Sequence, residues 1–330
     1  MKCPIKGLIH VTGESDSGKS TFAYTAGPEP ERIAFFDNDL KGKSIHKDLH
    51  FGAYFNLVRM FTQGGNFKPI AFFEMVMKLL DEIKEDEFDL IVFDNWTQIE
   101  SGLNAYAEEH ILEISDLSMG QARNMSQLTW PAKRTMYGRV LDSFLSKAET
   151  VIITTHLKNK WIGKVRTEAQ VPQCQQPLAE KASLRLWLRH NPDSQAPIGL
   201  VLKRISKSHY DKETGKVVIK PVLPRKINPC TWDVINGYLD NPLGDRALRS
   251  DEIPNEFELG ILDGVLTADQ KMMFQAALRG TEEVQVTPTT PAVIDIPNTV
   301  LVKEMAESGM KVSDIAKETG LSVVEVRGII

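Results

Sequence analysis

Cysteine is scarce in this chain: three cysteines, Cys3, Cys174 and Cys230, occur among 330 residues. They are too few and too scattered for a disulfide framework. They also cannot supply a structural zinc site, which takes about four clustered ligands. We therefore expect a protein of a reducing compartment.

Long apolar runs are missing as well. No stretch approaches the roughly 20 apolar residues of a membrane span, and the apolar stretch near the amino terminus is too short for a signal peptide. Glycine (22) and proline (17) are too few for a collagen-like or low-complexity chain, and the 42% hydrophobic content argues against disorder. We expect a globular cytoplasmic protein that makes no membrane contact.

Charge of either sign is also not in large excess, because 39 basic and 44 acidic residues give a formal net charge of -5. The distribution is uneven, however. Residues 158–226 contain fifteen Lys or Arg against five Asp or Glu, so this segment carries +10 and the remainder -15. A concentrated basic segment is what binding to a phosphate backbone requires.

Short apolar runs alternate with helical patterns over the first 225 or so residues, which is typical of an α/β fold with a mostly parallel sheet covered on both faces. A core-facing helix is expected at residues 70–84 and a hairpin at 208–225. The expected strands are residues 7–12, 32–36, 90–93, 151–155, 184–188 and 200–203.

The organisation predicted along the chain has four parts. Residues 1–227 form the core and 228–280 an irregular, partly helical extension. Residues 281–298, with prolines among Thr and acidic residues, read as a linker. Residues 299–330 look like a helix-turn-helix, with Gly320 in the turn, Leu321 in its core and Ser322 as the cap of the second helix. Such a unit could contact duplex DNA, or dock a protein or a second copy.

A phosphate loop is the clearest motif. Residues 13–20 match G-x-x-x-x-G-K-[ST], after an expected strand and before a segment that suits a helix. The glycines let successive N–H groups point at phosphate oxygens, Lys19 neutralises the β and γ phosphates, and the Ser20 hydroxyl ligates Mg²⁺. The expected nucleotide contacts are Gly13, Glu14, Ser15, Asp16, Ser17, Gly18, Lys19, Ser20 and Thr21.

Polar side chains end the other expected strands. Asp94 follows four apolar residues and is expected to hold the metal with Ser20. Asp37 and Asp39 end the strand near residue 36, and one of the two is expected to act as the carboxylate that orients water. His156 ends a further strand, where strand ends converge on ligand in such sheets. The motifs together predict a site for ATP with Mg²⁺.

These residues resemble the RecA recombinase family of P-loop ATPases. The loop GESDSGKST is similar to that family's GPESSGKTT, and FFDND occupies the place of its strand-end acidic motif. The resemblance implies the catalytic carboxylate position for Asp39, the metal-holding position for Asp94 and the phosphate-sensing position for His156. It covers residues 7–226, about two-thirds of the chain.

The resemblance also implies two DNA-binding loops. Residues 118–133, which include Arg123, resemble the segment beginning at the first loop, and residues 157–176 take the place of the second. The second carries Lys158, Lys160, Lys164 and Arg166 together with Trp161, a combination in which cations follow the strand and an aromatic ring stacks a base. A solvated charged loop around a buried Trp is the alternative.

Lys203 and Arg204 follow a strand that resembles the family strand whose lysines reach the neighbouring subunit's nucleotide. That match implies contact in trans within a homo-oligomer, either a ring or a filament. A surface pair at a strand end is the alternative.

Three functions remain open. The first is a DNA-dependent ATPase that binds single-stranded DNA and supports recombination, annealing or repair, similar to phage-encoded RecA-like annealing ATPases. The second is an ATP-switched regulator or helicase loader that acts through the helix-turn-helix. A small-molecule phosphotransferase is disfavoured because no basic lid or acceptor-pocket pattern is present.

Overall fold

The structure, a computed structural model, describes residues 5–27, 29–38, 50–58, 60–63, 66–114, 126–162, 165–174, 176–203, 205–211, 216–243 and 248–265. The chain divides into two compact units, Met1–Leu278 and Arg279–Ile330. The expected linker at 281–298 and helix-turn-helix at 299–330 lie outside the described residues.

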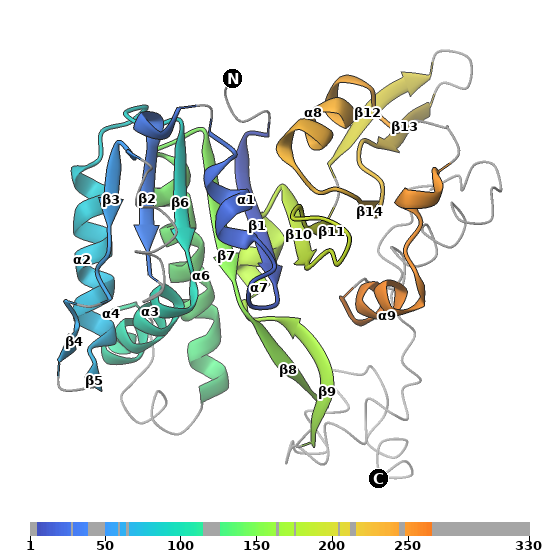
Figure 1. Cartoon of the computed structure of the whole chain (residues 1–330). Helices are drawn as coiled ribbons and strands as arrows, with labels where there is room; N and C mark the ends of the chain where they lie inside the picture. The colour runs from blue at the N-terminus through green and yellow to red at the C-terminus, as the bar shows by residue number, and fades with distance from the viewer. Residues whose placement is uncertain are drawn as a thin grey trace, which may run out of the picture. The chain divides into compact units, whose positions relative to one another are not determined.

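A central eight-stranded sheet organises the described part of the chain (Figure 1). The six strands β10, β1, β7, β6, β2 and β3 are parallel, and at one edge β11 pairs antiparallel with β10 and β14 pairs antiparallel with β11. The expected α/β fold with a mostly parallel sheet is thereby confirmed. In spatial order the strands are β14 (Lys226–Ile227), β11 (Ile198–Lys203), β10 (Leu184–Arg189), β1 (Gly7–Gly13), β7 (Thr150–Thr155), β6 (Leu90–Asp94), β2 (Ile33–Asp37) and β3 (Ala53–Phe55).

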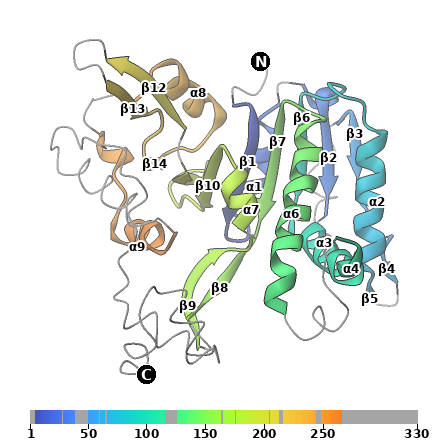
Figure 2. The same cartoon turned by 180° about the vertical axis from the view of Figure 1, so that it is seen from behind.

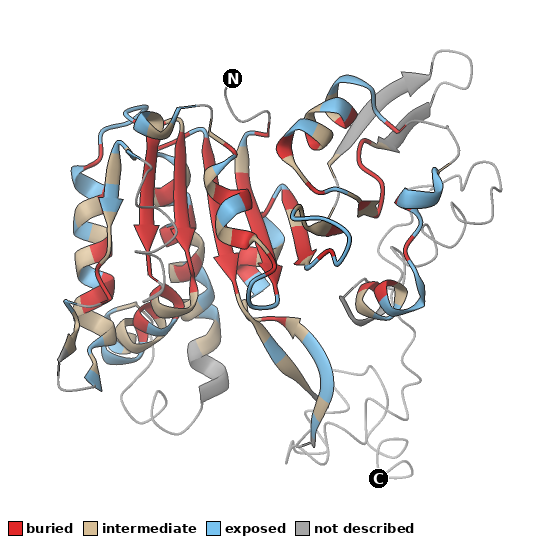
Figure 3. Ribbon diagram, viewed as in Figure 1, coloured by how far each residue is buried: buried red, intermediate tan, exposed pale blue. Residues whose placement is uncertain are grey.

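Helices cover both faces of this sheet (Figure 2). One apolar cluster joins the sheet to α2 (Pro69–Glu82), α3 (Thr97–Glu109), α6 (Ser126–Leu145) and α7 (Gln176–Lys181), and a second joins its other face to α1 (Lys19–Tyr24) and α8 (Trp232–Asp240). Successive strand residues alternate between the two clusters, as Leu8 and Ile9 do, because strand side chains point to opposite faces. The central strands are therefore buried on both sides (Figure 3).

Smaller elements surround the sheet. Three two-stranded hairpins are present in the described residues. They pair β8 (Leu157–Ile162) with β9 (Val165–Pro172), β12 (Ser206–Asp211) with β13 (Lys216–Pro221), and β4 (Thr62–Gln63) with β5 (Asn66–Phe67). The pair β12–β13 confirms the hairpin expected at 208–225. Helices α4 (Ile111–Ile114) and α9 (Glu256–Val265) and the 3-10 turns Pro30–Arg32 and Ser250–Glu252 complete the described elements. None of the described helices has the length and apolarity that crossing a membrane requires.

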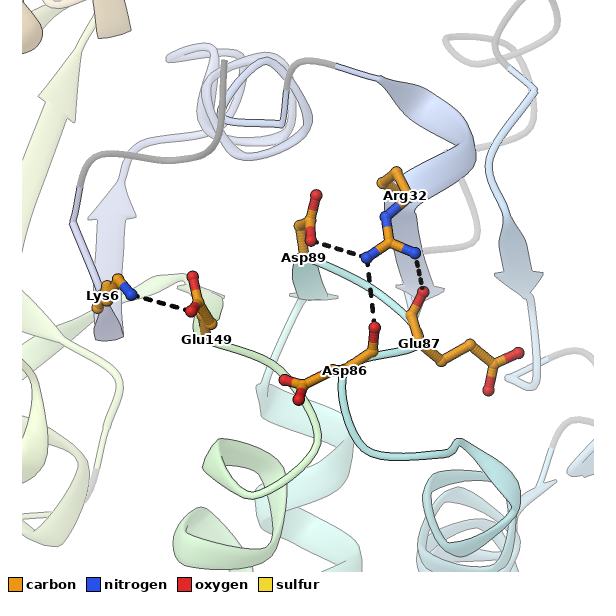
Figure 4. A network of polar contacts seen from close by, with 6 residues as sticks. All are labelled: Lys6, Arg32, Asp86, Glu87, Asp89 and Glu149. Atoms are coloured by element: carbon orange, nitrogen blue, oxygen red, sulfur yellow. Dashed lines mark hydrogen bonds and ion pairs between the residues drawn. The ribbon is translucent and has the colours of Figure 1, made fainter.

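Ion pairs link neighbouring strands at the amino-terminal edge of the parallel sheet (Figure 4). Arg32 contacts the Asp89 carboxylate at 2.9 Å and the main-chain oxygen of Glu87 at 2.8 Å, which ties the start of β2 to the start of β6. Lys6 pairs with Glu149 at 2.9 Å, between the starts of β1 and β7. The opposite, carboxyl-terminal edge is where the polar residues singled out by the motifs gather.

Helix α9 is attached through a buried carboxylate. Glu258 is fully buried and pairs with Arg189 at 3.2 Å and with Lys226 at 3.0 Å, while its oxygen also caps the main-chain N–H of Asn255. Phe257 lies under the Arg189 guanidinium, 4.5 Å from its ring centre. A buried carboxylate needs such partners, because an unpaired charge away from water is strongly disfavoured.

Helix α8 packs directly behind the helix that follows the phosphate loop. The Trp232 ring stacks on Phe22 of α1 with centres 4.6 Å apart, and its indole N–H donates to the Phe22 main-chain oxygen at 2.7 Å. Residues beyond 227 thus complete the core around α1, and the contact could not be anticipated from the irregular pattern of 228–280.

We predict that Trp232→Ala lowers the free energy of unfolding by about 3–5 kcal/mol, because it removes a buried ring and its hydrogen bond. Urea denaturation followed by circular dichroism measures this change. Asp240→Ala, on the exposed side of the same helix, should stay within about 0.5 kcal/mol of wild type. Equal losses for both variants would contradict a specific docking role for the Trp232 ring.

Candidate functional site

The loop between β1 and α1 has the backbone that a phosphate-binding loop requires. Gly18 has φ +82°, which favours glycine. At Gly13 a Cβ would stand 2.2 Å from the Leu188 main-chain oxygen, so no side chain fits there. Asp16 also has a positive φ, of 59°. Within this tight curl Glu14, Ser15 and Asp16 are exposed.

Lys19 is held inside this curl. Its side chain is buried, and Nζ donates to the main-chain oxygens of Gly13 at 3.0 Å and Glu14 at 2.5 Å. Ser17 Oγ also donates to the Glu14 oxygen, at 2.9 Å. Ser20 is half-buried at the start of α1 and Thr21 is exposed. The predicted nucleotide contacts therefore lie on the loop and on the first turn of α1, and the Lys19 ammonium group points back toward the loop.

Asp94 lies at the carboxyl end of β6, as expected. It is buried, and its Oδ1 accepts a hydrogen bond from Thr154 Oγ1 at 2.5 Å. Asp37 is its register neighbour on β2, and Tyr54 and Asn56 both donate to Asp37 Oδ2. Asp37 is thus held by groups of β3 and the residue after it. Asp39, the alternative catalytic carboxylate, lies outside the described residues.

His156 contacts the residue that follows Asp94. Its Nε2 lies 2.9 Å from Asn95 Nδ2, and because an amide nitrogen only donates, Nε2 is the acceptor. Asn95 Oδ1 accepts in turn from the main-chain N–H of Thr97 at 3.0 Å. The structure therefore brings His156 and the Asp94–Asn95 pair together, whereas the motif spacing could not specify their contact.

Oxygen atoms suited to Mg²⁺ are present at this edge. Magnesium is bound through one or two carboxylates together with hydroxyl groups and water. Asp94 offers a carboxylate and Ser20 a hydroxyl of this kind. A further oxygen, Asn38 Oδ1, is buried and has no hydrogen-bond partner in the described part of the chain. The residues present fit a magnesium–nucleotide complex, with Lys19 as the cation for the phosphates.

A second buried network runs beneath the loop from β10 to β7. Arg185 Nε donates to His10 Nδ1 at 3.2 Å, and His10 Nε2 lies 2.8 Å from Thr155 Oγ1. Since Arg185 can only donate, the imidazole proton is on Nε2 and is donated to Thr155. Thr12 Oγ1 donates to the main-chain oxygen of Thr155 at 3.3 Å. Residues of strand β1 thus bind both the side chain and the main-chain oxygen of Thr155, the residue that precedes His156.

The burial of this network keeps His10 neutral. Loss of hydration lowers the pKa of His10 well below its ordinary value, and the nearby Arg185 charge lowers it further. Burial also lowers the pKa of Arg185. Sequence reasoning missed His10, although a histidine at an inward position of a strand leading into a phosphate loop is the signal that could have found it.

The predicted DNA-binding residues fall on a different element. Within the segment 157–176, Leu157–Ile162 and Val165–Pro172 form the β8–β9 hairpin, and α7 begins at Gln176. Lys158 and Arg166 are exposed, and Lys160 is half-buried. The Trp161 backbone pairs with Arg166 in the hairpin, and its side chain lies outside the described residues, as do Lys164, Arg123 and Arg204.

Lys203 lies apart from the phosphate loop, at the end of β11. Its Nζ donates to the Glu180 main-chain oxygen at the end of α7, at 2.6 Å. Partial burial and the neighbouring Arg185 charge lower the pKa of Lys203. Within one chain, the structure therefore brings together the loop, Asp94 and His156, and leaves Lys203 on another part of the sheet.

We predict that His10→Gln removes a pH-dependent part of stability. Because the folded pKa of His10 is depressed, its contribution is complete above about pH 6.5. As the pH falls below that value it is lost at about 1.4 kcal/mol per pH unit, since the unfolded chain takes up the proton more readily. Urea denaturation between pH 7.5 and 5.5 should show the stability advantage of wild type over His10→Gln shrinking. The exposed His190→Gln is the control and should keep the wild-type slope; a constant gap between wild type and His10→Gln would contradict the assignment.

Comparison with known proteins places this site in a family. No curated protein matches the chain. Among solved structures, the chain is similar to one described as the crystal structure of the RadB recombinase, with 15% identity over 66% of this chain and 87% of the other, and a TM-score of 0.36. Residues 6–188, more than half of the chain, match the family described as AAA domain. This range includes the phosphate loop, Asp94 and His156, and the chain belongs to the AAA domain family.

Proposed function

We propose that the protein is a magnesium-dependent ATPase of RecA-like type that binds single-stranded DNA and supports recombination, annealing or repair. The observation that carries the ATPase part is the meeting of three elements at one sheet edge. These are the glycine-shaped loop with buried Lys19, the Asp94 carboxylate at the end of β6, and His156 in contact with Asn95. Membership in the AAA domain family supports the same function.

The roles follow from the chemistry of each group. The loop N–H groups and Lys19 bind the phosphates of ATP, and Ser20 and Asp94 hold Mg²⁺, which neutralises charge on the phosphates when it is bound. Thr154 fixes the orientation of Asp94 through the bond to Oδ1. The acidic segment at the end of β2, either Asp37 or Asp39, orients and deprotonates the attacking water. His156 senses the terminal phosphate.

Single-stranded DNA binding is proposed for the β8–β9 hairpin. The hairpin begins at the residue after His156 and projects beyond the carboxyl edge of the sheet in both views (Figures 1 and 2). Its base closes through the Gln173 N–H, which donates to the His156 main-chain oxygen at 2.8 Å. Lys158 and Arg166 offer exposed cations. A DNA contact that moved the hairpin would therefore act on a residue of the nucleotide site.

Assembly is proposed to complete the site. Lys203 and Arg204 would reach the nucleotide of a neighbouring copy in a ring or filament, which would make turnover depend on protein concentration. A relation to phage-encoded annealing ATPases, based on the sequence resemblance, is part of the same proposal.

We predict that Lys19→Ala reduces ATP turnover about 100-fold or more, because the cation that stabilises charge on the transferring phosphate is lost. Phosphate release should be measured with and without single-stranded DNA, and wild-type turnover should rise with DNA. The exposed Lys78→Ala on α2 is the control and should keep wild-type turnover. Undiminished turnover by folded Lys19→Ala would exclude this loop as the site of hydrolysis.

We also predict that the double variant Lys158→Ala, Arg166→Ala weakens DNA binding while ATP binding persists. If both cations contact phosphates, the slope of log K against log salt should become shallower by about 1.4, since each single-strand contact contributes about 0.7. Fluorescence anisotropy with a labelled oligonucleotide measures this slope. The control removes two exposed cations elsewhere, Lys78 and Lys84, and should leave it unchanged. A wild-type slope in the hairpin variant would place the DNA on another surface.

A further inference from the structure

Asn38 is the residue directly after β2, and its side chain is fully buried at the carboxyl edge of the sheet. Its main-chain N–H donates to the Asp94 main-chain oxygen at 2.6 Å, and its Nδ2 donates to the Asn95 main-chain oxygen at 3.2 Å. Two hydrogen bonds therefore fix Asn38 against the peptide that carries the predicted metal ligand. The side-chain amide is therefore fixed through its nitrogen, Nδ2, and the surroundings of its oxygen, Oδ1, are the remaining question.

That oxygen has no partner. Asn38 Oδ1 is shielded from solvent and accepts no hydrogen bond from the part of the chain that the structure describes. Buried side-chain oxygens are rarely left this way, because the loss of hydration is not offset. An unpaired acceptor on a residue bonded to the peptide of a predicted metal ligand is expected where a bound ligand supplies the missing donor or cation.

The same edge collects other acceptors of this kind. Asn56 Oδ1, Thr97 Oγ1 and Gln98 Oε1 are also buried without a hydrogen-bond partner among the described residues. Asn56 follows β3 and donates to Asp37, while Thr97 donates its N–H to Asn95. Acceptors therefore follow the neighbouring strands β3, β2 and β6. Buried oxygens of this kind suit water molecules and hard cations, since both bind oxygen.

We propose that Asn38 Oδ1 holds a water molecule of the magnesium ion bound with ATP, and so orients the metal toward Asp94. Mg²⁺ keeps several waters in protein sites and gives them up reluctantly, so a protein oxygen that accepts from such a water acts on the metal without entering its ligand set. Asn38 is then a positioning residue for the metal. This inference rests on the proposed ATP site, and it gives a role to Asn38, which lies between the two aspartates of the FFDND segment and to which the motif assigns none.

The test is the metal dependence of nucleotide binding at equilibrium, which requires no turnover. A fluorescent, non-hydrolysable ATP analogue is titrated into wild type and variants, once in EDTA and once in Mg²⁺. For wild type we expect tighter binding in Mg²⁺. Asn38→Ala should lose about 10-fold of that gain, as is typical when a group behind a metal ligand is removed, and should bind the metal-free analogue as wild type does.

Asn38→Asp separates this role from a structural one. The substitution keeps an acceptor oxygen at the same place and removes the donor to the Asn95 oxygen. If the metal-bound water matters, Asn38→Asp keeps or increases the gain from Mg²⁺; if the bond to Asn95 is what matters, it loses the gain as Asn38→Ala does. Should Asn38→Ala not fold, the comparison of Asn38→Asp with wild type decides in the same way.

Asn191→Ala provides the matched control. Asn191 is another buried asparagine, but its amide is satisfied, with Nδ2 donating to Ser194 and Asn228 and Oδ1 accepting from Asp193. It follows β10, four strands away from β2 in the sheet, and should keep the full gain from Mg²⁺. A full gain in folded Asn38→Ala overturns this inference alone. Failure of wild type to bind the analogue in either condition overturns the proposed function, and the inference with it.

Discussion

The site depends on the parallel pairing of four central strands, β1, β7, β6 and β2, which end at one edge of the sheet. Parallel strands place their carboxyl ends together, so the residues that follow each strand become neighbours although they are far apart in sequence. Thr12 and Thr155 are paired in register, as are Asp37 and Asp94. The strand interiors are apolar and buried on both faces, so their close packing against the helices of both layers fixes this register.

The polar groups at that edge are held by one another. Thr154 holds Asp94, Asn38 and Asn95 link β2 to β6, and His10 with Thr12 holds Thr155. A buried polar group is tolerated only where it finds a partner, so such a layer specifies one arrangement more sharply than apolar packing does. The amino edge has a different character, since its ion pairs are partly exposed and contribute little individually.

Sequence reasoning was sufficient for the elements with strong local signals. The loop 13–20 has a spacing that few other structures satisfy, and the strand at 90–94 is apolar up to Asp94, so both were placed correctly. The contact between His156 and Asn95 was out of reach, since it depends on β7 lying between β1 and β6. Trp232 was missed for a related reason: its partner Phe22 is 210 residues away, and no periodic pattern reports such a pairing. His10 precedes the loop motif and Asn38 lies between the two aspartates of FFDND, but neither position has a role assigned by a motif, and their buried contacts depend on the fold.

The hairpin β8–β9 is connected directly to the carboxyl edge of the sheet, through the residue after His156. If DNA binds the hairpin and ATP the phosphate loop, as proposed, both ligands would act on the chain that leaves β7, the first through Leu157 and Gln173 and the second through His156. Because Thr155 is tied to β1 by its side chain and by its carbonyl, β7 cannot shift at this point without disturbing the strand that leads into the loop. Two binding events that favour different positions of one constrained strand end must influence each other's affinity, and by the same factor in both directions. Coupling between DNA and nucleotide would then follow from the geometry of a single residue pair, Thr155 and His156, and would need no large rearrangement of the sheet.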